Sequence, residues 1–317
     1  MGDKAGTDER SVGVTRIDWD EQLMRALLFV PGSDERKLGK VTSFGADVIV
    51  VDLEDAVADD RKTAARATTR SAIESYSRDQ VNTVRVNGIE TGRLHDDIAA
   101  VVCPNLDAIL VPKIEDTDTL AEADRALAEA EQANGMQTGS VRVLAIVETP
   151  RGISRCDEIL DQAPDRTVTA IFGLGDFSVA LGVDLTEGGA ELAYARGRVV
   201  VAARGAGMVA PIDGPYLDVE NADGLLDDSR RQRTLGFQGR VAVYPPQVAV
   251  INRAFSELTD EEATRTRRVV EAFEEAESRG VASLRVDGRF VDYPIYYLCR
   301  RKLARFDAYR ETEGSRS

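Results

Sequence analysis

Short apolar runs alternate with helical patterns eight times between residues 26 and 243, and this repetition restricts the fold more than any other feature. Each run has four or five residues, mostly apolar, which suits a buried strand better than a helix. The runs cover residues 26–30, 48–51, 83–86, 108–111, 143–147, 169–172, 207–211 and 240–243. Helical patterns between them include 61–77, 116–133 and 188–205. Eight β/α repeats predict an α/β fold of the (β/α)₈ TIM-barrel type.

The main alternative is an open, doubly wound sheet. Such a sheet usually has fewer strands and a glycine-rich phosphate-binding turn after the first one. Here the first run ends in Pro31-Gly32-Ser33, and the glycines of GLGDFS follow the sixth run and lack a third glycine. We therefore expect a barrel over residues 23–256, preceded by a flexible N-terminal tail at 1–22.

The segment 257–317 has a different character and predicts a C-terminal helical extension. Thr259 precedes a long charged helix with acids in its first turn, and Gly280 follows it as C-cap. Asp287-Gly288 predicts a hairpin turn, and residues 295–309 predict a last helix. This segment has little apolar surface to bury by itself, so we expect it to pack on the barrel or on a neighbouring subunit.

Charge and composition exclude several function classes. The net charge of −15 disfavours binding to nucleic acid or an anionic membrane. No apolar run approaches the roughly 20 residues of a membrane span, and the polar N-terminal sequence lacks a signal core, so we expect a cytoplasmic protein. Only six of the 40 basic residues are Lys, and such an acidic, Lys-poor composition suggests a halophilic protein.

Histidine and cysteine are too sparse for much chemistry. His95 is the only histidine, which excludes a multi-histidine metal site, and we expect it to be structural or solvent-facing. Cys103, Cys156 and Cys299 are far apart in sequence and are each expected to be buried, without a disulfide framework or zinc site. Catalysis must therefore use carboxylates, Arg, Lys or a metal ion.

Two successive predicted strands run out into carboxylates, Glu148 in VLAIVETPRG and Asp176 in TAIFGLGDF. Carboxylates at adjacent strand ends can share one Mg²⁺, which needs few protein oxygens and leaves room for substrate. From spacing alone, caps of helices or ion pairs with Arg remain equally open.

Other polar residues follow the remaining strands, where barrel enzymes carry their active sites. They include Glu54 and Asp55 after the second strand, Arg85 at the third, Lys113 after the fourth and Asp213 after the seventh. Acids and one Arg on one rim predict metal-assisted handling of an anionic substrate. Arg85 would supply a bidentate cation for a carboxylate or an enolate oxygen.

These motifs resemble the acyl-CoA lyases related to the citrate lyase beta subunit, which include malyl-CoA, methylmalyl-CoA and citramalyl-CoA lyases. The resemblance runs from about residue 24 to 303 and rests on RALLFVPGSDERKLGK, VIVVDLEDAVADDRKTAAR, VRVNG, VPKIE, IVETPRGI, FGLGDFSVALG, ARGRVVVAARGAG with IDGPY, and DGRFVDYP. Their order along the chain makes the match far more specific than any single motif.

The resemblance implies Mg²⁺ or Mn²⁺ held by Glu148 and Asp176, with Arg85 as the active-site arginine. It places Glu54 and Asp55 in the pocket lining. It also implies a trimer or hexamer in which the extension reaches a neighbouring subunit.

In that assembly a catalytic Asp292 would be donated across the interface. Arg36, Lys37 and Lys40, on the first helix, would contact the phosphates of coenzyme A, unless they are only surface charges.

The implied reaction is reversible cleavage of a 3-hydroxyacyl-CoA, of the malyl-CoA or methylmalyl-CoA type, into a 2-oxo acid such as glyoxylate and an acyl-CoA, through an enolate. Lys113 need not form a Schiff base and is expected to be structural or to contact substrate or a CoA phosphate. The chain departs from its relatives at Tyr244-Pro245, where they often carry His-Pro.

Four alternatives remain open at this point. Three are enzymes: a malyl-CoA thioesterase, a citrate lyase beta-type subunit acting on an acyl-carrier-protein thioester, and a CoA-independent 2-oxo-acid aldolase. The fourth is a non-catalytic barrel that serves as a scaffold.

Overall fold

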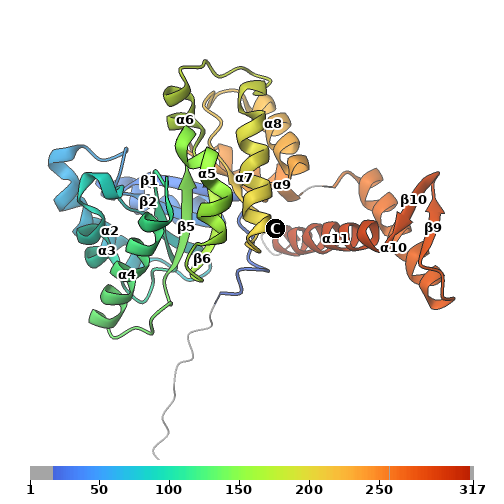
Figure 1. The fold of residues 1–317 in the computed structure, drawn as a ribbon, viewed down its shortest axis with the longest axis horizontal. Helices are drawn as coiled ribbons and strands as arrows, with labels where there is room; N and C mark the ends of the chain where they lie inside the picture. The colour runs from blue at the N-terminus through green and yellow to red at the C-terminus, as the bar shows by residue number, and fades with distance from the viewer. Residues whose placement is uncertain (1–16, 257, 315–317) are drawn as a thin grey trace, which may run out of the picture.

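A computed structural model describes residues 17–256 and 258–314 of the chain, and it contains a closed barrel of parallel strands (Figure 1). Each strand pairs with the next in sequence order, and the last pairs with the first. The strands are β1 (Ala26–Pro31), β2 (Val48–Asp52), β3 (Val81–Arg85), β4 (Ala108–Val111), β5 (Arg142–Val147), β6 (Thr167–Phe172), β7 (Ile212–Asp213) and β8 (Gly239–Ala242). The predicted (β/α)₈ fold is confirmed.

Helices connect the strands and cover the outside of the barrel (Figure 1). They are α1 (Glu35–Leu38), α2 (Lys62–Ser75), α3 (Leu94–Val101), α4 (Thr117–Ala133), α5 (Pro150–Asp161), α6 (Leu174–Leu181), α7 (Ala193–Gly205), α8 (Ala222–Leu235) and α9 (Gln247–Ser256). Short 3₁₀ turns extend several connections. No helix among the described residues combines the length and apolarity that crossing a membrane requires.

Side chains alternate between two hydrophobic clusters, as strands of a barrel require. On β2, Val48 and Val50 belong to the cluster inside the barrel, whereas Ile49 and Val51 belong to the cluster between strands and helices. Within the predicted tail at 1–22, Ile17 and Trp19 pack against the inner cluster, and residues 1–16 lie outside the described residues.

The seventh strand was predicted in the wrong place. The predicted run at 207–211 forms no strand, and β7 has only two residues. Gly207 has a φ of 75°, and the N–H of Met208 donates to the carbonyl of Ala203, so this segment ends helix α7 instead of pairing. The third strand also begins and ends earlier than predicted, at Val81–Arg85.

The C-terminal extension consists of α10 (Asp260–Ser278), β9 (Ser283–Val286), β10 (Arg289–Asp292) and α11 (Tyr293–Gly314). Thr259 caps α10 in a complete capping box with Glu262, and Asp287 and Gly288 form the hairpin turn, as predicted. The last helix begins two residues earlier than predicted and is longer.

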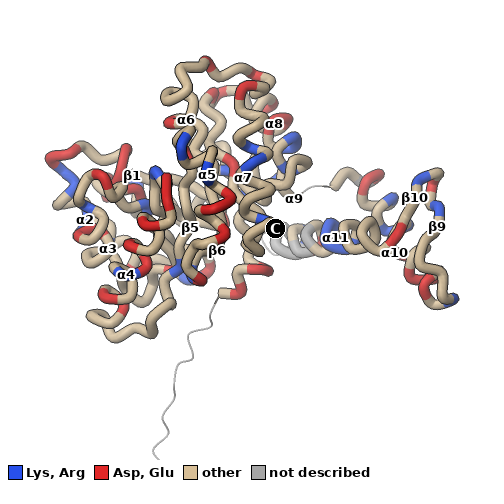
Figure 2. Tube along the Cα trace, in the orientation of Figure 1, with Lys and Arg blue, Asp and Glu red and all other residues tan. Residues whose placement is uncertain are grey.

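The hairpin and α10 project away from the barrel, while α11 runs back toward it (Figure 1). The extension has its own small cluster of Phe273, Val291 and Tyr296. The guanidinium of Arg25, below β1, stacks on the ring of Tyr309 at 5.3 Å. Acidic and basic residues recur along both the barrel and the extension (Figure 2).

Candidate active site

Arg85 is held rigidly at the carboxyl end of β3 by Asp52, its register partner at the end of β2. The guanidinium donates from Nε to Asp52 Oδ1 at 2.7 Å and from Nη2 to Oδ2 at 2.6 Å. The Asp52 carboxylate is buried and also accepts the backbone N–H groups of Glu54 and Ala56. A bidentate pair of this kind fixes the plane of the guanidinium as well as its position.

The third nitrogen of Arg85 faces the carboxylates that follow β2. Nη1 lies 2.9 Å from Glu54 Oε2 and 3.2 Å from Asp55 Oδ2. Burial alone lowers the pKa of Arg85, but Asp52, Glu54 and Asp55 raise it by more, so the net shift is upward. The arginine therefore remains a cation. The sequence did not reveal that Asp52 holds Arg85.

Lys113 lies at the carboxyl end of β4 and has a φ of 53°, which is rare for a side-chain-bearing residue. Its backbone N–H donates to Glu148 Oε1 at 2.9 Å. Its ammonium lies 3.2 Å from Glu54 Oε1 and 3.9 Å from Glu90 Oε1. The residue therefore connects carboxylates that come from different strands.

Glu148 and Asp176 come from neighbouring strand ends, as the sequence predicted. Glu148 directly follows β5, and Asp176 lies in the first turn of α6 after β6. Neither caps a helix: Thr149 caps α5, and the N-cap of α6 is Gly173. The Asp176 side chain is half-buried and makes no hydrogen bond or ion pair with any described residue, so the pairing with Arg that remained open is absent there.

Gly173 leaves the space that the Glu148 side chain occupies. A Cβ on Gly173 would lie 2.4 Å from both Cβ and Oε2 of Glu148. Only glycine is compatible with this position of the carboxylate, since such contacts are far inside van der Waals distance. The glycine of FGLGD therefore has a packing role that its sequence alone did not reveal.

Burial makes the carboxylates of this site costly to ionise. It raises the pKa of Glu54 to about 7, although Arg85 and Lys113 draw that pKa down. Burial, together with the negative charges of Glu54 and Asp176, raises the pKa of Glu148 to about 8. A bound cation would stabilise the ionised forms of both groups.

The donor set fits Mg²⁺. Glu148 and Asp176 supply two carboxylates without competing arginine partners, and Mg²⁺ commonly takes one or two carboxylates and completes its shell with water and substrate. Among the described residues, no cluster of three or more His, Cys, Asp or Glu side chains forms a cage for a metal. The arrangement therefore suits an open site and not a closed structural one.

A buried network supports the backbone under Glu54. The ammonium of Lys62 donates to the carbonyls of Leu53 and Glu54 and to Asn87 Oδ1. Asn87 in turn donates from Nδ2 to Asp97. The sequence analysis did not assign these roles. The signals that could have indicated them were Lys62 in the DRKTAAR motif and Asn87 directly after the predicted third strand.

Asp292 is not brought to the mouth of its own barrel. It ends β10 in the projecting hairpin, and its Oδ1 accepts the N–H of Ile295 at 3.3 Å (Figure 1). Arg36 and Lys37 lie on α1 as predicted, but Lys40 lies beyond its end, because α1 stops at Leu38.

The structure also places the remaining residues that the sequence singled out. His95 is half-exposed and pairs with Glu122 at 2.7 Å. Cys103 and Cys156 are buried, but Cys299 is only partly buried on α11, which corrects that prediction. Tyr244 follows β8 and is 45% exposed.

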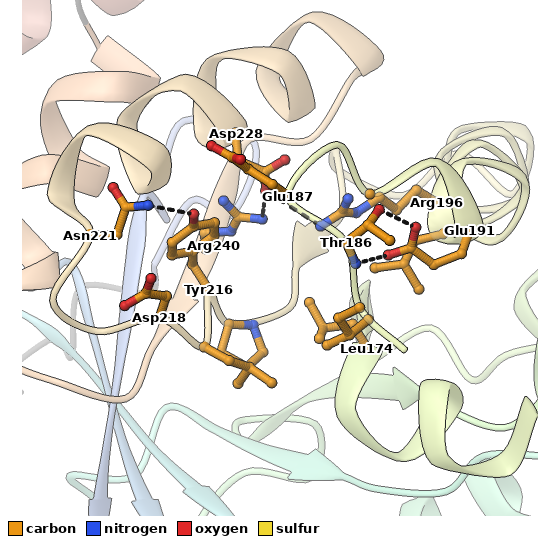
Figure 3. A pocket seen from close by; sticks show the side chains of 15 residues that line it. Leu174, Thr186, Glu187, Glu191, Arg196, Tyr216, Asp218, Asn221, Asp228 and Arg240 are labelled. Carbon is orange, nitrogen blue, oxygen red and sulfur yellow. Dashed lines mark hydrogen bonds and ion pairs between the residues drawn. The ribbon is translucent and has the colours of Figure 1, made fainter. Parts of the chain in front are cut away.

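A cavity of about 360 Å³ lies beside the mouth, between the loops after β6 and β7 (Figure 3). Arg240 and Arg196 lie at its base and both contact Asp213 and Asp228. Arg231, which is half-exposed, also contacts Asp228 Oδ1 at 3.0 Å, so the two carboxylates meet three guanidinium groups. Each buried guanidinium at the base of the cavity has a carboxylate partner, and the network fastens the barrel wall.

Comparison with known sequences adds three findings. The family described as HpcH/HpaI aldolase/citrate lyase matches residues 25–245. The citrate lyase subunit beta of Leuconostoc mesenteroides subsp. cremoris is 30% identical over 300 residues, which cover 93% of this chain and 98% of that protein. A (3S)-malyl-CoA thioesterase of Cereibacter sphaeroides is 34% identical over 287 residues, covering 90% and 95%.

Among solved structures, the protein CitE of Mycobacterium tuberculosis, in complex with magnesium, acetoacetate and coenzyme A, superposes with a TM-score of 0.74. It is 26% identical, and the match covers 90% of this chain and 98% of that one.

Proposed function

The chain belongs to the HpcH/HpaI aldolase/citrate lyase family, and we propose that it is a Mg²⁺-dependent lyase that reversibly cleaves a 3-hydroxyacyl-CoA of the malyl-CoA or methylmalyl-CoA type. The products would be a 2-oxo acid such as glyoxylate and an acyl-CoA. The observation that carries this proposal is the position of Glu148 and Asp176 beside the clamped Arg85 at one end of the barrel.

Glu148 and Asp176 would hold the metal, which when bound supplies positive charge to the hydroxyl and carboxylate oxygens of the substrate. Arg85 would bind the negative charge that develops on the enolate oxygen, and Asp52 keeps its guanidinium from turning away. Glu54 and Asp55 lie against the Arg85 guanidinium and would line the same pocket.

Asp292 would protonate the enolate carbon in the site of a neighbouring subunit, within a trimer or hexamer. This part of the proposal is supported by the projecting hairpin, which holds Asp292 away from its own barrel (Figure 1). It is also supported by the exposed apolar side chains beside Asp292, such as Phe290, Tyr297 and Leu298.

Arg36, Lys37 and Lys40 remain proposed contacts to CoA phosphates at the end of β1. A cytoplasmic location is also proposed, which the three unpaired cysteines support.

The test is a product assay in molar KCl with Mg²⁺. Purified protein is mixed with malyl-CoA or methylmalyl-CoA, and glyoxylate and free thiol are measured separately. We expect glyoxylate without thiol, with loss of activity in EDTA and recovery on adding Mg²⁺.

Arg85→Lys should lose at least about 10²-fold in kcat, because lysine cannot make the bidentate pair with Asp52 that orients the guanidinium. The control is Arg125→Lys on the exposed face of α4, whose kcat should be unchanged.

A thioesterase is the second candidate, favoured by the 34% identity to a protein named (3S)-malyl-CoA thioesterase. Thiol without glyoxylate would establish that outcome and reject the lyase. Turnover only with an acyl-carrier-protein thioester would favour a citrate lyase beta-type subunit, and turnover of a free hydroxy-oxo acid would favour a CoA-independent aldolase.

A further inference from the structure

The backbone of Lys113 has a positive φ of 53°, although the residue does not lie in a hairpin turn. Only Lys113 and Asp287 combine a side chain with positive φ among the described residues, and Asp287 lies in a hairpin turn where this is usual. Lys113 instead lies two residues after the end of β4, and the next residue, Ile114, donates its N–H to the carbonyl of Ile146 on β5. The turn at Lys113 directs one N–H away from the strand ladder and toward Glu148.

The side chain of Lys113 is surrounded by carboxylates. Its ammonium contacts Glu54 and Glu90, and the negative charges of Glu54, Asp176 and Asp55 all raise the pKa of Lys113. Glu54 is buried, and neither of its oxygens has a hydrogen bond of good geometry. Lys113 and Arg85 are the cations that lie against its two oxygens, one on each. Without Lys113, one oxygen of Glu54 would be buried beside no positive charge.

Lys62 shows what a purely structural lysine looks like in this protein. Its ammonium is buried and donates to two backbone carbonyls and the amide oxygen of Asn87. Lys113 is about one-third exposed, and within residues 17–256 and 258–314 its ammonium contacts only carboxylates. Because no backbone carbonyl holds the ammonium of Lys113, its interaction energy depends on the charges of the carboxylates and of any ion bound at this end of the barrel.

We propose that Lys113 is a positioning residue and the built-in counter-cation of this site: its N–H orients Glu148, and its ammonium holds Glu54 and weakens cation binding at Glu148 and Asp176. The proposal rests on the proposed function for the identity of the metal-binding pair. The consequence is that Lys113 lowers the affinity for the metal ion and at the same time holds Glu54 in place. A lysine with only a structural role would not lower the metal affinity.

Three variants separate the charge from the backbone contact. Lys113→Met and Lys113→Gln keep the N–H and remove the ammonium, and Lys113→Arg keeps a cation of similar reach. Arg125→Met on α4 is the matched control for loss of an exposed charge. Mg²⁺ affinity is measured by titration calorimetry without substrate, and kcat and KM are measured in the product assay.

We expect Lys113→Met to bind Mg²⁺ about threefold or more tightly, because a like charge has been removed from beside the ion. We expect its kcat to fall about tenfold or more, since groups that orient the contacts of a site typically contribute this much. Lys113→Arg should restore both values toward the wild type. In a Glu54→Gln background, Lys113→Met should cause little further loss of kcat, because the lysine acts through Glu54.

Unchanged or weaker Mg²⁺ binding in both Lys113→Met and Lys113→Gln overturns the proposal, as does wild-type kcat in either. The proposal is also overturned if the kcat of the Glu54→Gln, Lys113→Met double variant falls by the product of the two single-variant losses. If the wild type binds Mg²⁺ but cleaves no CoA ester, the proposed function fails while the affinity test of Lys113 still stands. A wild type that does not bind Mg²⁺ overturns both.

Discussion

Single residues at the barrel mouth owe their positions to neighbours on other strands. Asp52 fixes Arg85 from the adjacent strand, Lys113 orients Glu148 from another, and Gly173 leaves the space for the Glu148 carboxylate. None of these contacts joins residues close in sequence. The affinity of the site for a metal ion therefore depends on the register of the barrel strands. Adding even one methyl group to a side chain here should change that affinity.

Gly173→Ala should weaken Mg²⁺ binding by about tenfold or more, because the added Cβ would overlap Glu148 and displace its carboxylate. The control is Gly175→Ala, two residues along the chain, where a Cβ meets no atom within 4 Å. Calorimetric titration of both variants with Mg²⁺ tests this. Equal affinities in the two variants would show that Gly173 does not shape the site.

Among the secondary-structure elements, β7 is the weakest part of the barrel wall. β7 has two residues, and a single residue pair, Ile171 with Ile212, joins it to β6. The buried network of Arg196, Arg240, Asp213 and Asp228 lies across this position and connects β7, β8, α7 and α8. Figure 3 shows Arg196, Arg240 and Asp228 at the base of the cavity. Side-chain ion pairs here replace the backbone pairing that a longer strand would supply.

Arg240→Met should lower the free energy of unfolding by about 3–5 kcal/mol, because it leaves Asp213 and Asp228 buried with one cation fewer. Arg155→Met removes a partly exposed pair with Glu158 and a donor to the carbonyl of Glu115, and should cost about 1 kcal/mol. Urea unfolding of both variants gives the comparison. A loss as small for Arg240 as for Arg155 would contradict a fastening role of the network.

At the scale of the whole molecule, the extension and the net charge both point beyond the single chain. The hairpin that carries Asp292 projects from the barrel, and its aromatic side chains form only a small cluster of their own (Figure 1). Acidic side chains recur along both the barrel and the extension (Figure 2), and the chain has a net charge of −15. Assembly and salt dependence are therefore properties to measure on the complete chain.

Asp292→Asn should keep the fold and Mg²⁺ binding but lose at least about 10²-fold in kcat, as expected for removal of a general acid. Mixing this variant with inactive Arg85→Lys, after dissociation and reassembly, should restore about a quarter of the sites if Asp292 acts across the interface. Restored activity cannot arise if Asp292 acts within its own chain. The control is each variant reassembled alone.

The midpoint of thermal unfolding should rise by at least about 3 °C between low and molar KCl, because salt screens the repulsion among the excess acids. Scanning calorimetry at the two salt concentrations tests this. An unchanged midpoint would reject adaptation to high salt.

The sequence by itself determined the features that local periodicity and local chemistry encode. Alternating apolar runs and helical patterns predicted the barrel, polar residues at strand ends predicted the location of Arg85, Glu148 and Asp176, and the cap at Thr259 marked the start of α10. These signals lie within a few residues of one another, so one sequence is enough to read them.

Only the tertiary structure decided the contacts that depend on barrel closure. They are the clamp of Asp52 on Arg85, the turn of Lys113 toward Glu148, the fit of Gly173 and the shortness of β7. Each joins residues from different strands, or depends on how far a strand can pair before its neighbour turns away. A sequence pattern carries no such distances, because they arise only when eight strands share one closed register.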